Sequence, residues 1–582
     1  MNSSSSRLDA SIDPITAEII AHRICAIPNL IDTNITRTAF SPLVAEYKDF
    51  AVGMVDANGN LITQSRGGIP VFCANALSVG VRDGLKIYGK SNLQHGDVVI
   101  TNDAGTMGQH LNNVLMYTPI RTSEADSGLL GFMAVVVHWV DVGGITIGSC
   151  LSSETTDVFQ EGIQFHTVKA YSRGAPVEEI FRMIRSNTRF PDLVMGDFDS
   201  QLAGCLMGRD MTLDILTRYG LVEVQRAIEY LWHQSEAKVR ETILAIPDGT
   251  YRASSFLDDD GVNKEQPLQV KVEVHVNEDE LTVDLSGLGK QVDGPMNAGY
   301  EGGAVAAARI ACKYFFSSDE QANEGASRPV KVHCPPGTFL SATPGAPLSG
   351  SGNMLPTVVD TILRALGAAD PARAQAAHHG TYGLHVLTGH TNDGDLFYHM
   401  ESTIGGWGAS HNRDGTGPFR SIVHGDTLEV PAELQEASNP YLLEWVRLRQ
   451  DSGGAGKYRG GLGVEKCYRI LKPVDLTVIM ERTKCPPWGL DGGREGETGR
   501  VEVHRVGANE PQIIYKDTAA LLEGDRVLLF SAGGGGFGPI EERSTDQIKK
   551  DVIRGYVSPE AAEKEYGLSS ADLTTRLMIT MA

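Results

Sequence analysis

The sequence predicts an α+β protein of several domains, with mixed β-sheets and peripheral helices. Its 582 residues exceed what one compact core usually organises. Segments with a helical hydrophobic period and short strand-like runs follow one another in an irregular order, which favours α+β over a doubly wound sheet. We expect a disordered start at 1–12 and three structured regions: an N-terminal domain with the candidate site (13–250), a middle α/β region (251–440) and a β-rich region ending in helices (441–582).

The N-terminal region is predicted to begin with a helix. Asp13-Pro14 opens it, because proline in a first turn gives up only a donor that would be unpaired there. The isoleucines that follow recur at helical spacing, and Pro28 is expected to kink or end the helix. Further along, 50–56 and 61–65 predict a hairpin around an Asn-Gly turn. Apolar runs at 96–101 and 129–142 predict buried strands, and 180–185 and 197–245 predict helices.

The rest of the chain alternates between strand and helix patterns. Residues 251–286 show the period of two that is typical of strands, whereas 302–316 and 355–366 predict helices. Strands dominate after residue 440, and 544–567 predict a helix, a turn and a second helix. The strand-like runs after residue 440 are 442–449, 463–470, 475–482, 499–506 and 525–532.

Charge and cysteine usage exclude several classes of partner. The chain has 51 Lys and Arg against 73 Asp and Glu, a net charge of −22, and no basic cluster. Neither nucleic acid nor an anionic membrane surface is therefore expected as a partner. The eight cysteines form no CxxC pair, and the polar N-terminus lacks an export signal, so we expect a reduced, cytoplasmic protein. No apolar run approaches the length of a membrane span.

The segment GAGKY at 454–458 is similar to a phosphate-binding loop but lacks its defining residues. Asp451 stands where the first glycine belongs, and Tyr458 stands where Ser or Thr would bind magnesium. No ATP site of this kind is therefore predicted in this chain.

A GxGxxG spacing occurs at Gly533, Gly535 and Gly538, after a predicted strand. Pro539 follows at once, and the chain ends too soon to complete a βαβ unit. A sharp glycine turn is the favoured interpretation over a dinucleotide site. The sequence also contains no GxSxG, HExxH or papain-like cysteine motif.

Histidine, aspartate and asparagine side chains gather at predicted strand ends in the first third of the chain. A divalent ion such as Zn²⁺ or Mn²⁺ binds three to six nitrogen or oxygen ligands, typically histidine with carboxylate. His110 and His138, with Asp49 and either Asn113 or Asp141 beside them, would meet that requirement. The alternative is that His138 is a hydrogen-bonded core histidine and that Asp141 caps a turn. The spacing matches no strict motif and leaves both interpretations open.

A second group of histidines lies around a glycine-rich strand region. Tandem histidines on loops are more often solvated or in contact with substrate than bound to a metal. We expect this of His378, His379, His385, His390 and His399.

Several segments together resemble a known family. In chain order they include DPITAEII, GDVVITNDAGTMGQHLNN, VHWVDVGG, GDFDSQLAG, DSGGAGKYRGGLG and GGGGFGP. Along essentially the whole chain they are similar to the hydantoinase B/oxoprolinase family. The resemblance implies an A-type partner subunit, in a heterotetramer, which binds ATP and phosphorylates the carbonyl oxygen of the substrate. It therefore agrees with the lack of an ATP site in this chain.

The resemblance also implies a metal site and its ligands. His110 and His138 match the histidines that hold a divalent metal in the family, zinc being favoured and manganese the alternative, and Asp49 matches an acid of the site. Asn113 stands where the family more commonly has aspartate. An amide oxygen is a neutral, weaker ligand, so either the coordination is altered or another acid, Asp103 or Asp141, completes the site. Trp139 replaces a second histidine, and Asn112 replaces a proline.

The function we expect is that of a metal-binding subunit of an ATP-dependent hydrolase of small cyclic amides of the lactam, hydantoin or oxoproline type. The metal would act on a water or an oxyanion, and Asp103 or Asp141 would take the proton. Two alternatives are a subunit of an ATP-dependent ketone carboxylase of the acetone or acetophenone type, and a scaffold that only stabilises the A-type subunit. The sequence does not choose the substrate.

Overall fold

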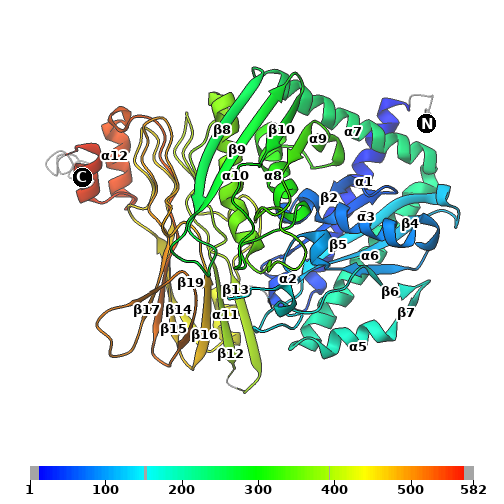
Figure 1. Cartoon of the computed structure of the whole chain (residues 1–582), viewed down its shortest axis with the longest axis horizontal. Coiled ribbons are helices and arrows are strands. Elements are labelled where there is room, and N and C mark those ends of the chain that lie inside the picture. Colours follow the sequence, from blue (N-terminus) through cyan, green and yellow to red (C-terminus); the bar gives the residue numbers. More distant parts are fainter. Residues whose placement is uncertain (1–11, 150–153, 392, 569–582) are drawn as a thin grey trace, which may run out of the picture.

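The computed structural model describes residues 12–149, 154–391 and 393–568. Of the disordered start expected at 1–12, residues 1–11 lie outside these ranges. Figure 1 shows the N-terminal sheet and its helices on one side, and a layer of long strands from the C-terminal region on the other. The strands β8 to β10 and the helices α8 and α10 lie between these two parts. The fold is α+β with several separate sheets, as predicted.

The N-terminal part is built on a seven-stranded sheet in the order β2-β1-β5-β4-β3-β6-β7. The predicted hairpin is present, and its turn is held by the Asp56 carboxylate, which accepts hydrogen bonds from the backbone N–H groups of Asn58 and Asn60. Every residue of β4 and β5 is buried, which explains their continuous apolar character. The strands are β1 (Phe50–Asp56), β2 (Leu61–Gln64), β3 (Val98–Thr101), β4 (Asn113–Arg121), β5 (Leu129–His138), β6 (Val168–Ser172) and β7 (Ala175–Pro176).

Long helices cover this sheet, and the first of them does not end at Pro28, which was one of the two outcomes predicted there. α1 (Pro14–Thr38) begins at the predicted Asp13 cap but runs through Pro28 without ending. Pro28 lies on the buried face with Ile24, Ile27 and Ile31, so packing of that face outweighs the backbone hydrogen bond that proline cannot make.

The helical region predicted at 197–245 is two helices. α6 (Pro191–Tyr219) and α7 (Leu221–Leu244) are separated at Gly220, whose φ of 81° interrupts the helix. Shorter elements of the N-terminal part are α2 (Pro42–Ala45), the π-helical turn η1 (Phe72–Ala76), α3 (Leu77–Tyr88), α4 (Ala104–Met107) and α5 (Glu178–Ser186).

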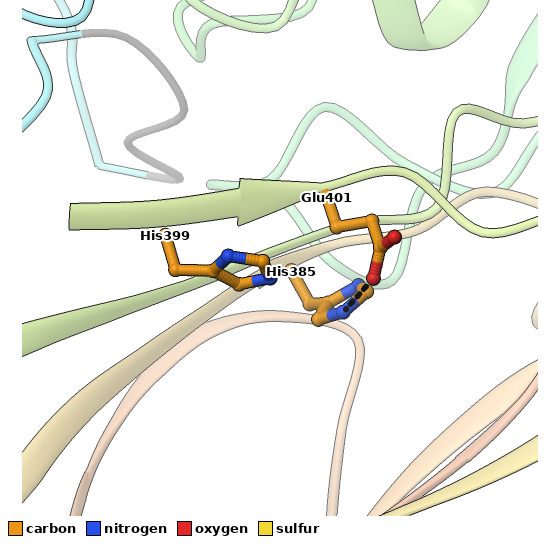
Figure 2. Close-up of side chains that lie close together, drawn as sticks. All are labelled: His385, His399 and Glu401. Atoms are coloured by element: carbon orange, nitrogen blue, oxygen red, sulfur yellow. Dashed lines mark ion pairs between the residues drawn. The ribbon is translucent and has the colours of Figure 1, made fainter. Parts of the chain in front are cut away.

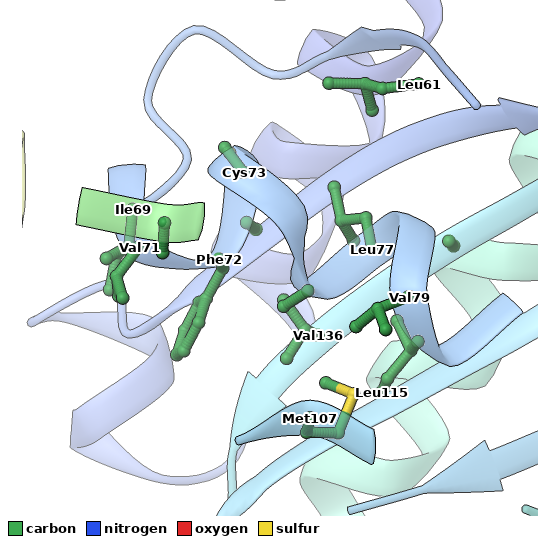
Figure 3. Close-up of a cluster of buried hydrophobic side chains, with 14 of the residues drawn as sticks. Leu61, Ile69, Val71, Phe72, Cys73, Leu77, Val79, Met107, Leu115 and Val136 are labelled. Atoms are coloured by element: carbon green, nitrogen blue, oxygen red, sulfur yellow. The ribbon is translucent and has the colours of Figure 1, made fainter. Parts of the chain in front are cut away.

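The segment of η1 and α3 lies over the seven-stranded sheet. Figure 3 shows Phe72, Leu77 and Val79 in a cluster with Leu115 and Val136 of the strands beneath. Apolar packing of this kind is the main source of rigidity in a protein interior. It fixes the neighbouring chain from 69 to 72, which forms one wall of the cavity described below.

A four-stranded sheet follows, in the order β11-β10-β9-β8. α10 (Ser351–Ala369) packs against β8 and β9, and α8 (Ala306–Ser317) contacts β11, whereas α9 (Glu324–Ser327) packs against α7 and α8. The N-terminus of α10 is buried and reaches the N-terminal sheet, where Ser351 contacts His110. The strands are β8 (Gly249–Leu257), β9 (Leu268–Asn277), β10 (Glu280–Asp284) and β11 (Val330–His333).

Two further sheets form the C-terminal part around a second apolar core. One has the order β13-β12-β16-β19 and combines strands from before and after residue 440, and the other has the order β14-β15-β20-β17-β18. The strands are β12 (Leu384–His390), β13 (Leu396–Glu401), β14 (Tyr441–Leu448), β15 (Val464–Ile470), β16 (Val474–Ile479), β17 (Arg500–His504), β18 (Gln512–Ile514), β19 (Lys516–Leu521) and β20 (Arg526–Phe530). The predicted final pair of helices is present as α12 (Thr545–Ile553) and α13 (Pro559–Tyr566), and α11 (Ala432–Ser438) precedes β14.

The glycine-rich segment at 533–538 serves close backbone packing, and residues 533–536 do not form the sharp turn that we predicted. Gly534 N–H donates to Gly461 O at 2.9 Å, and Gly535 N–H donates to Ala377 O at 2.8 Å. A Cβ added at Gly533 would overlap the carbonyl oxygen of Ser452. The segment leads to the short turn η7 (Ile540–Glu542) and not to a dinucleotide-binding helix.

Within the described ranges, no helix combines the length and the apolar character that crossing a membrane requires.

Candidate metal centre

A small enclosed cavity of about 30 Å³ lies where the N-terminal sheet meets α10 and two later loops. A volume of this order holds one or two water-sized groups. Apolar side chains from 69–72 and Leu355 form part of its wall. Its polar lining is Asp49, Gln109, His110, Asn113, His138, Ser351, Tyr382 and His424.

Backbone hydrogen bonds bring the predicted ligands together. Asn113 begins β4 and lies opposite His138, which ends β5. The His138 N–H donates to the carbonyl oxygen of Asp49 at 3.0 Å, so the start of β1 joins the same point. His110 precedes β4 in a tight turn, in which the Asn113 N–H donates to His110 O at 3.3 Å. Three strand ends therefore place Asp49, His110, Asn113 and His138 around one cavity.

The two imidazoles lie edge to face, with ring centroids 5.2 Å apart. His110 Nδ1 lies 3.5 Å from the Ser351 hydroxyl, whereas its buried Nε2 has no hydrogen-bond partner in the part of the chain that the structure describes. Buried polar atoms are nearly always satisfied, so such an atom indicates a place for a ligand or a water. Burial lowers the pKa of His110 to about 4, so its ring is neutral at neutral pH and carries a lone pair.

Asn113 presents an acceptor to the cavity. Its Nδ2 donates to Gln109 Oε1 at 3.0 Å, which fixes the orientation of the amide. The buried Oδ1 is left without a hydrogen-bond partner among the described residues. An amide oxygen in this position is available as a neutral ligand.

Asp49 supplies the carboxylate of the cavity. Burial raises its pKa to about 7, and the nearby Arg420 guanidinium opposes that rise. A buried carboxyl group is costly to ionise, and a bound divalent ion would reduce that cost further than Arg420 does.

Four further polar residues of the cavity were missed by sequence reasoning: Gln109, Ser351, Tyr382 and His424. Tyr382 stacks on His424 with ring centroids 3.9 Å apart and an interplanar angle of 6°. The Tyr47 hydroxyl lies 3.2 Å from His424 Nε2, and His424 Nδ1 is buried without a partner in the described ranges. Ser351 and His424 come from segments far along the chain, and no local motif marks either of them.

Asp103 and Asp141, the predicted proton acceptors, do not line the cavity. Asp103 caps α4 by accepting from the Thr106 N–H at 2.9 Å, and it pairs with His166 at 2.5 Å. Asp141 accepts from the N–H groups of Gly143 and Gly148, each at 3.0 Å.

Asp141 also forms an ion pair with Arg189 at 2.8 Å, and it accepts from the Arg189 backbone N–H. These bonds hold a tight turn in which Gly143 and Gly144 have φ values of 91° and 84°. Asp141 therefore has the turn-capping role that the sequence left open as the alternative.

The types of donor atom around the cavity suit a divalent metal. However, the candidate ligand atoms of its His and Asp side chains lie farther apart than those of a second group of residues. Among the described residues, one set of three His, Cys, Asp or Glu side chains has ligand atoms that all lie within 4.8 Å of one another: His385, His399 and Glu401. A metal in the first cavity would require Asp49, His110 and His138 to move closer together, with Asn113 as the fourth donor.

The second histidine group is mostly buried and not solvated, whereas we expected it to be either solvated or in contact with substrate. His378, His379, His385 and His399 are buried, whereas His390 is exposed. The reason is that the glycine-rich segment leads into β12, which is covered on both faces, instead of forming a surface loop. Figure 2 shows His385, His399 and Glu401 pointing toward one another from β12 and β13.

The fold and the cavity agree with one class of protein: the chain belongs to the hydantoinase B/oxoprolinase family, whose model matches residues 13–540. An uncharacterized protein of Methanocaldococcus jannaschii is 31% identical over 558 residues, which are 95% of this chain and 96% of that one. The caprolactamase subunit beta of Pseudomonas jessenii is 27% identical over 577 residues, or 96% of each chain.

Solved structures share the whole fold. The ATP-dependent caprolactamase of Pseudomonas jessenii matches with a TM-score of 0.90 and 25% identity, over 96% of this chain and 97% of that one. A nucleotide-free acetone carboxylase matches with a TM-score of 0.86 at 20% identity, over 98% of this chain and 83% of that one, which shows a common fold.

Proposed function

We propose that this chain is the metal-binding B-type subunit of an ATP-dependent cyclic-amide hydrolase. The observation that carries the proposal is the full-length likeness to ATP-dependent caprolactamase, together with the cavity at the ends of β1, β4 and β5. An A-type partner subunit would bind ATP and phosphorylate the carbonyl oxygen of the substrate. Amide resonance makes a lactam a poor electrophile, and phosphorylation of its oxygen would remove that resonance.

The residues that would hold the ion are His110, His138 and Asp49, with Asn113 Oδ1 as a neutral fourth donor. A bound zinc or manganese ion would supply a Lewis acid and an acidified water. Because Asn113 carries no charge, the site would bear one negative charge fewer than a site with two carboxylates. We therefore expect weaker metal binding than a site with Asp at this position would give.

A proton acceptor is also required, and His424 is the group best placed for that role. It lines the cavity, and its Nδ1 has no partner in the described part of the chain. Tyr382 and Tyr47 hold its ring by stacking and by hydrogen bonding. Asp103 and Asp141 are engaged in their own turns, so we assign this step to His424 in their place.

The test is turnover by the chain co-expressed with its A-type partner. Lactams, hydantoins and ketones would be compared with ATP present, each with and without bicarbonate. We expect bicarbonate-independent hydrolysis of a cyclic amide. ATP use that requires both a ketone and bicarbonate would instead establish a ketone carboxylase and overturn the hydrolase.

The His110→Ala/His138→Ala double variant separates a catalytic subunit from a scaffold. We expect turnover to fall by about a thousandfold or more while part of the ATPase activity remains. Unchanged turnover would mean that the chain only stabilises its partner.

A further inference from the structure

A second group of buried donors lies in the C-terminal part, outside the cavity described above. We propose that His385, His399 and Glu401 form a second site for a divalent transition-metal ion, with zinc as the ion that this ligand set favours. All three side chains are buried, and one ligand atom from each lies within 4.8 Å of the others. Two imidazoles and one carboxylate are a known zinc-binding set.

The strand register explains why the three side chains meet. His385 of β12 lies directly opposite Glu401 of β13, so their side chains share one face of the pair. His399 precedes Glu401 by two residues and therefore projects from the same face. Figure 2 shows the three side chains converging on this face. The convergence is therefore a property of paired backbone and does not depend on a flexible loop.

Tyr468 sets the tautomer of His385. The Tyr468 hydroxyl donates its one hydrogen to Glu401 Oε2 at 3.3 Å. When the hydroxyl donates to this carboxylate, its contact with His385 Nε2 at 3.0 Å is a hydrogen bond that the imidazole N–H donates. A neutral imidazole with its hydrogen on Nε2 carries a lone pair on Nδ1. A metal-binding histidine oriented by a hydrogen bond at its other nitrogen has this arrangement.

Each of the three residues keeps one buried atom unsatisfied. His385 Nδ1, His399 Nε2 and Glu401 Oε1 have no hydrogen-bond partner within the ranges that the structure describes. Three such atoms in one cluster would be costly if the cluster stayed empty. Bonds of about 2.0–2.2 Å would bring tetrahedral ligands to roughly 3.4 Å apart, so ligand atoms separated by up to 4.8 Å would have to approach by up to about 1.4 Å.

A buried cation, Lys466, already contacts this cluster. It lies 3.3 Å from Glu401 Oε2 and also contacts Glu429, so its positive charge is shared between two carboxylates. Lys466 and Tyr468 both contact Oε2, which leaves the other carboxylate oxygen for a metal. An ion bound to Glu401 would therefore join the buried network of ion pairs and hydrogen bonds that links Glu401, Lys466 and Tyr468.

An ion in the second site would also restrain residues at the first cavity. Ser402 follows Glu401 directly, and its hydroxyl lies 2.6 Å from that of Tyr47. Tyr47 in turn contacts His424 of the first cavity. A metal that fixed Glu401 would therefore fix the segment that holds Tyr47, which assigns the second ion a structural role.

The test is zinc content per chain, measured by mass spectrometry on the full-length protein after loading with ZnCl₂ and dialysis. We expect two zinc ions in the wild type and one in the His110→Ala/His138→Ala variant. Adding His399→Gln to that double variant should remove the remaining ion. A double variant without zinc, or a triple variant that keeps its zinc, would overturn the proposal.

A wild-type comparison covers the case in which the double variant does not fold. In a Co²⁺ titration, the wild type should then bind two equivalents of Co²⁺ per chain, and the single His399→Gln variant should bind one. Equal uptake by the two proteins would also overturn the proposal. The counts of two assume the metal ion proposed for the first cavity. The second site by itself predicts that His399→Gln binds one equivalent fewer than the wild type, whichever count the wild type shows.

Tyr468→Phe tests the hydrogen-bonding argument, with Tyr441→Phe as a matched control. The Tyr441 ring packs against Tyr468, but its hydroxyl bonds to Asn439 and Gln435. In the His110→Ala/His138→Ala background, or in the wild type if that background does not fold, we expect Tyr468→Phe to weaken zinc binding at the second site about 10- to 100-fold, and Tyr441→Phe to leave it unchanged. Equal affinities in the two variants would overturn the assignment of His385 Nδ1 as a ligand, and circular dichroism would verify the fold.

Discussion

Asn113 lies directly opposite His138 in the antiparallel pair of β4 and β5. The pairing places an amide oxygen beside a buried imidazole at the end of two fully buried strands. Strand register is fixed over many residues by the buried pattern, so this juxtaposition is firmly specified. With Asp49 and a neutral Asn113, the first cavity therefore has one negative charge fewer than a site with aspartate at both positions, within the same fold.

Asn113→Asp should strengthen metal binding. A carboxylate would replace a neutral donor, and we expect zinc affinity to rise by about tenfold or more. The measurement is competition against a chelator, with Asn58→Asp on the exposed hairpin turn as the control. Equal affinity in both variants would show that the Asn113 oxygen does not face the ion.

Asp141→Asn should destabilise the fold while leaving the metal content unchanged. Asp141 is fully buried and paired with Arg189, which is one-third exposed. Weakening this pair should cost about 1–3 kcal/mol, less than for a fully buried pair because solvent screens Arg189. Thermal unfolding and zinc content together check this expectation. An unchanged unfolding temperature combined with lost turnover would restore Asp141 to a catalytic role.

Glu161 should make stability depend on pH. Its Oε1 accepts from the N–H groups of Leu348 and Ser349, and burial raises the pKa of this carboxyl to about 8, from an ordinary value of 4.5. The folded state therefore holds a proton that the unfolded state has lost between these two values, and its contribution to stability falls as pH rises through that window.

Glu161→Gln mimics the protonated side chain and tests this effect. Between pH 5.5 and pH 8, the free energy of unfolding of the variant should rise by about 3 kcal/mol relative to that of the wild type. Urea unfolding at the two pH values measures the difference. A gap between the two proteins that stays constant with pH would show that Glu161 is ionised throughout this range.

Gly533→Ala should destabilise the C-terminal part. The new Cβ would overlap the Ser452 carbonyl oxygen, which belongs to backbone and cannot rotate away. We expect a loss of about 2–4 kcal/mol, whereas Gly67→Ala, where the nearest atom is 3.6 Å away, should be near neutral. Similar unfolding temperatures for the two variants would contradict the close packing of this segment.

Local sequence determined much of the fold and the centre of the first site. The Asp13 cap, the turn after Asp56 and the apolar runs of β4 and β5 lie where they were predicted, because hydrophobic period and turn chemistry act between near neighbours. His110 and His138 were predicted as neighbours for the same reason, since consecutive strands that pair bring their ends together.

Only the tertiary structure decided the remainder. Tertiary packing lets α1 continue through Pro28. It also places Asp141 where its carboxylate caps a turn, and it brings Ser351 and His424 to the cavity from distant segments. Buried strand pairing also turned histidines expected at the surface into a cluster with Glu401. The sequence therefore determined the residue types of the candidate metal site and the first strand ends. Long-range packing decided which side chains share a cavity, because such contacts leave no local period to detect.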